Sequence, residues 1–115
     1  MRNDRERFAD ILEAAQKIQS RVDRGRERFD ADEDMQIALT HLLQVIGEAA
    51  ARVSSNTTAR YPTVPWRQIV GMRNRVVHDY FEVDLEILWV AVTIDVPRLA
   101  RDIERIVGET RPSDE

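Results

Sequence analysis

The fold is decided by residues 35–53, which read MQIALTHLLQVIGEAAARV. The apolar residues of this stretch recur at steps of three and four, which is the period of a helix with one apolar face. They are Met35, Ala38, Leu39, Leu42, Val45, Ile46, Ala49 and Val53. Asp30, followed by Glu33 three residues later, resembles a capping box, so the helix is expected to begin near Asp30.

The chain before this stretch predicts another long helix. Its apolar face is formed by Phe8, Ile11, Leu12, Ala15, Ile18 and Val22. Asn3 or Asp4 can cap its start, and Gly25 can end it. On the other side, residues 54–65 contain turn formers and two prolines with no helical period, so they predict the longest loop, with Pro65 in the first turn of the next helix.

Two further helices follow from the second half of the sequence. The third is expected from Trp66 to the neighbourhood of Tyr80, and Asp84 is a suitable cap for the fourth. The apolar residues of the fourth are Leu85, Leu88, Trp89, Val92, Leu99, Ile103 and Ile106. Pro97 lacks an N–H and predicts a kink or break near residues 94–96. No segment alternates like a strand, so the sequence predicts an all-α, antiparallel four-helix bundle.

The length and composition of the chain exclude several classes of protein. A chain of 115 residues suits a single domain over 1–115, with a short flexible tail from about residue 109. No apolar run approaches the roughly 18 residues of a membrane span, and the charged start does not resemble a secretory signal, so we expect a cytoplasmic protein with no membrane contact. The chain has no cysteine and only two histidines, His41 and His78, so we expect neither a metal site nor a cofactor.

Arg73 does not fit a plain bundle. At about 100° per residue, it falls in the middle of the apolar stripe of the third helix. The stripe comprises Trp66, Ile69, Val70, Val76, Val77 and Tyr80. Burying an unpaired guanidinium is strongly unfavourable, so it requires a partner carboxylate, a polar cavity or a wet subunit interface. The commonest explanation is a buried salt bridge, for which Glu48 on the second helix is the candidate partner.

Asn74 and His78 lie four residues apart, which places both on one edge of a continuous helix beside Arg73. Metal-free RNA cleavage needs a group that moves protons and a cation that stabilises the phosphorane, and His78 and Arg73 match these roles. Tyr80 would point about 200° away from His78 unless the helix loosens or a second subunit completes the site. A histidine that caps carbonyls and a tyrosine in the core explain the same residues, so the residues alone leave the function open.

The segment GMRNRVVHDYF, residues 71–81, followed by VDLEILW at 83–89, resembles the HepT family of HEPN-domain proteins. The pattern Arg-x4-His-x-Tyr is that family's signature. The stretches IGEAA at 46–50 and Pro-Trp-Arg at 65–67 are also similar to the family. The resemblance covers about residues 5–108 and implies a HEPN-like helical bundle.

The resemblance also implies a function. Proteins of the HepT family are homodimeric, metal-independent ribonuclease toxins whose motifs meet at the dimer interface. By analogy, Arg73 would bind and stabilise the scissile phosphate, Asn74 would orient it, and His78 would be the acid–base catalyst, leaving a 2′,3′-cyclic phosphate. The partner would be a nucleotidyltransferase antitoxin that attaches AMP to Tyr80 and so blocks the RNA site.

The sequence allows three further interpretations besides that of a ribonuclease toxin. Arg67 and Arg75 are the expected extra contacts to RNA phosphates, although solvated arginines would look the same. The chain could instead be a noncatalytic module that binds a nucleotidyltransferase and a nucleotide, as its net charge of −4 would allow. The third interpretation is a purely structural bundle in which Arg73 forms an ion pair with Glu48.

Overall fold

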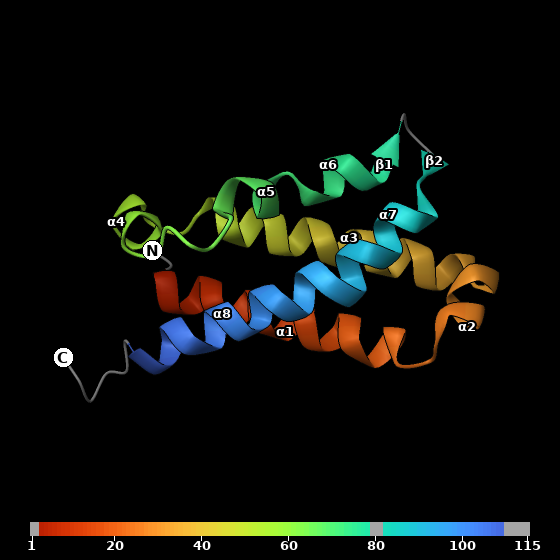
Figure 1. The fold of residues 1–115 in the computed structure, drawn as a ribbon, viewed down its shortest axis with the longest axis horizontal. Helices are drawn as coiled ribbons and strands as arrows, with labels where there is room; N and C mark the ends of the chain where they lie inside the picture. The colour runs from red at the N-terminus through yellow and green to blue at the C-terminus, as the bar shows by residue number, and fades with distance from the viewer. Residues whose placement is uncertain (1–2, 79–81, 110–115) are drawn as a thin grey trace.

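Four antiparallel segments build the bundle in the computed structural model, which describes residues 3–78 and 82–109. They are α1 (Asp4–Val22), α3 (Glu33–Ala51), α5 (Trp66–Val70) with α6 (Met72–Val76), and α7 (Leu85–Val90) with η1 (Ala91–Asp95) and α8 (Val96–Glu109). Each segment runs opposite to the one before it (Figure 1). The expected all-α, antiparallel four-helix bundle is therefore confirmed. The expected tail falls on residues 110–115, outside the described residues.

The start of α1 is capped as the sequence predicts, because the Asn3 side chain accepts a hydrogen bond from the backbone N–H of Glu6 at 3.0 Å. After α1 the chain turns at Gly25, whose φ of +95° is one that residues with a side chain rarely adopt. A short helix, α2 (Arg26–Ala31), follows, and the sequence did not predict it.

The cap expected for α3 was wrong. Asp32 caps this helix, its carboxylate accepting from the N–H of Met35 at 3.0 Å. Asp30 lies inside α2, where its carboxylate pairs with the Arg26 guanidinium at 2.8 Å. Residues 26–31 form a helical turn of their own, so Asp30 is not free to begin the next helix.

The expected loop at residues 54–65 contains a short helix, α4 (Ser55–Arg60). Asp4, at the start of α1, holds this helix in place. Its carboxylate accepts from the N–H of Ser54 at 2.9 Å, from the Ser54 hydroxyl at 2.7 Å and from the Thr57 hydroxyl at 2.5 Å. Burial tends to raise the pKa of Asp4, but these hydrogen bonds outweigh it and leave the pKa below its ordinary value.

The variant Asp4→Ala is therefore expected to lower the free energy of unfolding by about 1 kcal/mol at neutral pH, since it removes hydrogen bonds between α1 and α4. A carboxyl with a lowered pKa in the folded state stabilises the protein above its unfolded pKa, about 3.9, and this stabilisation is lost as the pH falls through the folded value. The difference between variant and wild type should thus shrink towards acid pH in urea titrations. A difference that stays constant down to pH 2 would contradict this account.

The third segment differs most from the expectation of one helix reaching Tyr80. It breaks at Gly71 and ends at Val76, and the chain then enters a small antiparallel ribbon of β1 (Val77–His78) and β2 (Glu82–Val83). Val77 lies opposite Val83 in this ribbon. β-Branched side chains pack well across a ribbon and have weak helix propensity, so the pairing of the two valines favours the extended conformation. The expectation of no strand was therefore wrong for these four residues.

The last segment begins as predicted, with the Asp84 carboxylate accepting from the N–H of Ile87 at 3.0 Å. The irregularity expected before Pro97 takes the form of the π-helical turn η1, in which the N–H of Val96 bonds to the carbonyl of Ala91, five residues back. Pro97 has no N–H for the carbonyl of Thr93, and the wider turn accommodates its ring. The chain nevertheless remains helical from Leu85 to Glu109.

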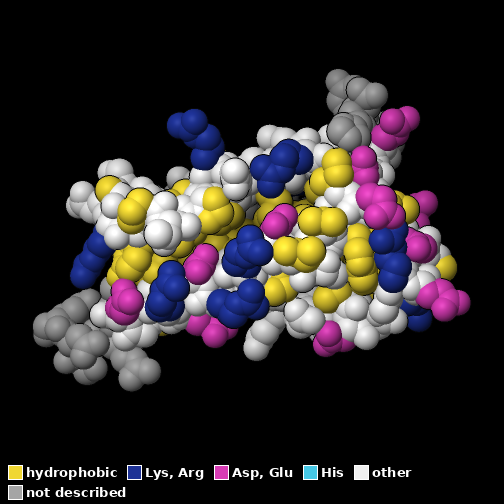
Figure 2. Space-filling model, viewed as in Figure 1, with side chains coloured by type: hydrophobic (Ala, Val, Ile, Leu, Met, Phe, Trp, Pro, Cys, Tyr) yellow, Lys and Arg dark blue, Asp and Glu magenta, His cyan; other side chains and the backbone are white. Residues whose placement is uncertain are grey.

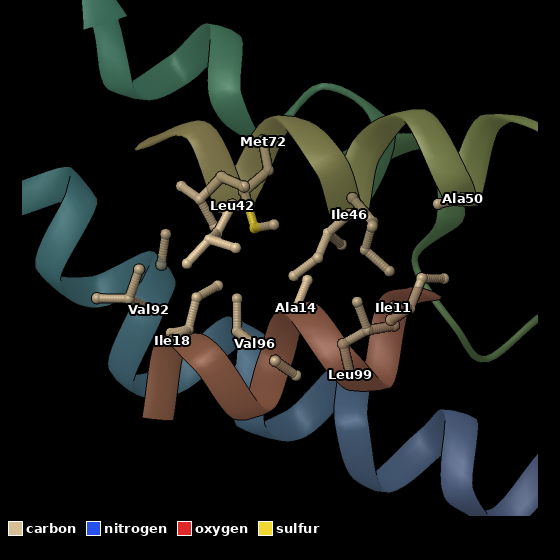
Figure 3. Close-up of a cluster of buried hydrophobic side chains, with 14 of the residues drawn as sticks. Ile11, Ala14, Ile18, Leu42, Ile46, Ala50, Met72, Val92, Val96 and Leu99 are labelled. Carbon is tan, nitrogen blue, oxygen red and sulfur yellow. The ribbon is translucent and has the colours of Figure 1, made fainter. Parts of the chain in front are cut away.

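The core lies between the segments and is apolar throughout the described residues. Figure 3 shows side chains of α1, α3, α6, η1 and α8 pointing towards one another. Those labelled are Ile11, Ala14, Ile18, Leu42, Ile46, Ala50, Met72, Val92, Val96 and Leu99. Within residues 3–78 and 82–109, no helix is long and apolar enough to span a membrane.

Candidate functional site

An open groove of about 520 Å³ runs between α3 and the α5–α6 segment. It contains polar side chains from both walls, which makes it the natural centre of a site. The lining residues are Gln44, Gly47, Glu48, Ala51 and Arg52 of α3 together with Val70, Arg73 and Asn74. Two of the four motif residues singled out in the sequence, Arg73 and Asn74, thus share one groove.

Gly47 sets the spacing of the two walls. A Cβ atom at this position would lie 3.0 Å from the backbone oxygen of Val70 and 3.4 Å from that of Ile69. A Cβ contact of 3.0 Å with backbone is tighter than most real ones, so a side chain here would push the end of α5 away from α3 by a few tenths of an ångström, and glycine favours the close approach. The close approach places the start of α6, with Arg73, next to Glu48 on α3.

Arg73 is half-buried, and its Nε atom is buried without a hydrogen-bond partner among the described residues. The expected ion pair with Glu48 is not present. The Glu48 carboxylate instead accepts from Nε2 of Gln44 at 3.2 Å, while the backbone oxygen of Glu48 accepts from the Arg52 guanidinium at 3.1 Å. A partly buried guanidinium attracts an anion, and the groove gives an anion access to it.

The arginines proposed as extra RNA contacts lie apart from this groove. Arg75 is exposed on the other side of α6 and borders a second groove with Glu86, Ile87 and Asp95. Arg67 is exposed on α5. The structure therefore groups Asn74 with Arg73, but it does not bring Arg67 or Arg75 into the same groove.

His78 lies in β1, two residues beyond the end of α6. The expectation that His78 and Asn74 share one helix edge was therefore wrong, because the helical spacing ends at Val76. In the ribbon, His78 is paired with Glu82. Tyr80, the fourth motif residue, lies outside the described residues.

The sequence reasoning missed most of the α3 wall. Gln44, Glu48 and Arg52 follow one another at intervals of four, which places them on one face of the helix. That row of polar residues was visible in the sequence, but only the close packing at Gly47 turns it towards Arg73. In the part of the chain that the structure describes, no three acidic, histidine or cysteine side chains gather as metal ligands would.

Comparison with known proteins identifies one protein family and relatives whose names refer to ribonucleases. The model of the family described as "Ribonuclease HepT-like" matches residues 11–106. A Methanocaldococcus jannaschii protein named "Putative RNase MJ1380" is 34% identical over 96 residues, which are 83% of this chain and 88% of that protein. The "Probable ribonuclease HepT" of Thermococcus cleftensis is 32% identical over 106 residues, or 91% of this chain and 96% of that protein. No solved structure matches.

The family match covers most of the chain and includes both walls of the groove. It also agrees with the helical bundle and with the motif that the sequence carries from Arg73 onwards. The chain belongs to the HepT-like ribonuclease family.

Proposed function

We propose that this protein is a metal-independent endoribonuclease, acting as the toxin of a toxin–antitoxin pair. The observation that carries the proposal is the partly buried Arg73 guanidinium, which has no hydrogen-bond partner on Nε among the described residues and borders an open groove beside Asn74. A cation held in this way fits a phosphate that gains negative charge during cleavage. Membership in a ribonuclease family supports RNA as the source of that phosphate.

The proposed reaction is an attack by a ribose 2′-oxygen on the adjacent phosphorus. The bond from phosphorus to the 5′-oxygen of the next nucleotide breaks, leaving a 2′,3′-cyclic phosphate and a 5′-hydroxyl. Arg73 stabilises the charge on the phosphorane, Asn74 orients the phosphate, and His78 transfers a proton. Arg67 and Arg75 lie outside the groove and would contact phosphates further along the RNA, Arg75 from the side of α6 that faces Ile87 and Asp95.

The direct test is cleavage of a defined RNA by the purified protein, after mass spectrometry has verified that Tyr80 is unmodified. The His78→Ala variant is expected to lower the rate by at least about 10²-fold, as for loss of an acid–base group, with unchanged helical content by circular dichroism. Intact RNA after incubation with the unmodified wild type would overturn the proposal. Tight nucleotide binding together with normal growth on expression would then favour the noncatalytic module.

We also propose that the protein works as a homodimer. Ile87, Val90 and Ile94 lie at intervals of three and four along α7 and η1 and are 39%, 46% and 49% exposed. Figure 2 shows hydrophobic side chains gathered in this region, with charged side chains of both signs around them. Arg75 and Asp95 lie beside the patch. A surface that carries both signs can complement a second copy of itself, as a two-fold interface requires.

The variant Val90→Glu is expected to weaken this dimer by more than about 100-fold, because it would bury a carboxylate without a partner in the interface. Light scattering during gel filtration measures the change. Ile37→Glu is the matched control, since Ile37 is 58% exposed on α3 and does not line the groove beside the patch. A dimer disrupted by the control and not by Val90→Glu would place the interface on α3 instead.

The proposed partner is a nucleotidyltransferase antitoxin that transfers AMP to Tyr80. The phosphate of AMP would bring negative charge and bulk close to the motif, where it would compete with RNA for Arg73. Co-expression with the antitoxin should increase the mass of the protein by one or more AMP groups and remove its RNase activity. Replacing Tyr80 with Phe should prevent the increase in mass.

A further inference from the structure

Glu48 is the acidic residue among the described residues that line the groove, and no part of the proposed reaction uses it. Its side chain is exposed, and among the described residues its carboxylate accepts a hydrogen bond from Gln44 alone, one turn earlier on the same helix. The expected pairing with Arg73 is absent between these described residues. The carboxylate is therefore available to a ligand in the groove.

The position of Glu48 is also unfavourable for simple phosphate binding. A carboxylate that lines the same groove as Arg73 repels an RNA phosphate. Its surface hydrogen bond to Gln44 contributes little to the fold, and among the described residues its carboxylate is bonded to no other helix. A role in the reaction would explain why a negative charge lies opposite Arg73 and Asn74.

RNA cleavage of the proposed type moves two protons. One leaves the 2′-hydroxyl as its oxygen attacks, and another must reach the departing 5′-oxygen. A single imidazole cannot accept the first and donate the second at the same moment. A second titratable group is needed on the other side of the phosphate, and Glu48 is the one such residue that the groove between α3 and α6 contains among the described residues.

We propose that Glu48 is the general base of the ribonuclease, with His78 as the general acid. The Glu48 carboxylate takes the proton of the 2′-hydroxyl while the 2′-oxygen bonds to phosphorus. The bond from phosphorus to the 5′-oxygen breaks, and the His78 imidazolium gives its proton to that oxygen. Exchange with water then returns Glu48 to the carboxylate and His78 to the imidazolium, so the step balances. This inference rests on the proposed function.

The groove also carries cations on both of its walls. The charged groups that line it with Glu48 are Arg52 on the same helix and Arg73 on α6. A phosphate bound by Arg73 would therefore lie in the same groove as the Glu48 carboxylate, within a set of side chains that comes from both α3 and α6.

The first test is the variant Glu48→Gln, which keeps the size of the side chain and can still accept from Gln44. We expect kcat to fall by about 10²-fold or more with KM unchanged or lower, and the acid limb of the pH–rate profile to disappear. Glu48→Asp should recover part of the rate. Glu33→Gln, at the exposed start of the same helix, is the control and should behave as wild type.

The second test separates the base from the acid with an RNA dinucleotide analogue whose 5′-oxygen is replaced by sulfur. A thiolate leaves without being protonated, so this substrate should restore the rate of His78→Ala and should not restore that of Glu48→Gln. The reverse pattern would make His78 the base and overturn the proposal. A change in KM alone in Glu48→Gln would also overturn it, since a base acts on kcat.

The outcomes for the wild type separate this inference from the function on which it rests. If the wild type cleaves RNA and Glu48→Gln cleaves it with the same rate and pH profile, the inference is wrong and the ribonuclease function stands. If the wild type does not cleave either substrate, the proposed function fails and the inference falls with it.

Discussion

Replacing Arg73 with alanine is expected to reduce RNA cleavage by about 10³-fold, the loss typical of removing a cation that stabilises charge in the transition state. The expectation follows from the guanidinium's half-buried position, where Nε has no hydrogen-bond partner among the described residues, and from its place on the groove. Single-turnover cleavage of a labelled RNA measures the rate. Arg73→Lys should be intermediate, because lysine keeps the charge but not the planar fork.

The same variant distinguishes a catalytic Arg73 from a structural one. Breaking a buried ion pair would destabilise the fold by about 3–5 kcal/mol. The structure shows no pair between Arg73 and Glu48, so we expect the change in the free energy of unfolding to stay below about 1 kcal/mol. Arg101→Ala, at an exposed position of α8, is the control for losing one arginine. A destabilisation in the range of a broken pair would support the purely structural bundle.

Phe29→Ala is expected to have the largest effect on stability, lowering the free energy of unfolding by about 3–5 kcal/mol. Phe29 is fully buried, and its ring lies 4.9 Å from that of Trp89 on α7. The Arg26 guanidinium lies 5.7 Å from the Phe29 ring and 5.6 Å from the Trp89 ring and also pairs with Glu86. Removing the Phe29 ring thus leaves a cavity and loosens α2 from α7.

Urea denaturation followed by circular dichroism measures this loss. The Ile37→Ala variant removes a side chain that is 58% exposed and should change stability by less than about 0.5 kcal/mol. If Phe29→Ala unfolds at the same urea concentration as wild type, α2 is not a stabilising part of the bundle. Retained RNase activity in a destabilised Phe29→Ala would show that α2 supports the fold and not the reaction.

The features that the sequence predicted are those with a local cause. Asn3 and Asp84 cap their helices through hydrogen bonds to residues three positions ahead, and Pro97 acts through its own ring and missing N–H. These interactions need no distant partner, so the pattern of residues is sufficient to locate them. The four-helix architecture followed from helical periods that are equally local.

The features that the sequence did not predict depend on contacts across the chain. The third segment ends at Val76 because Val77 has a partner in Val83, which the helical period of that segment does not reveal. The candidate site also depends on contacts between distant parts of the chain. Arg73 and Asn74 were identified from the motif, but the α3 wall becomes part of the site only because Gly47 lets two backbones approach closely.

The π-helical turn before α8 gives the last segment one residue more than a regular helix would need. Deleting any one of residues 91–95 would remove the wide turn and allow an uninterrupted α-helix, and because that turn absorbs the extra residue locally, Leu99 and Ile103 would keep their places in the core. The Pro97 ring would then clash with the carbonyl group of the preceding turn. A deletion within residues 91–95 should therefore cost less stability than a deletion inside α8, which would rotate the residues beyond it by about 100°.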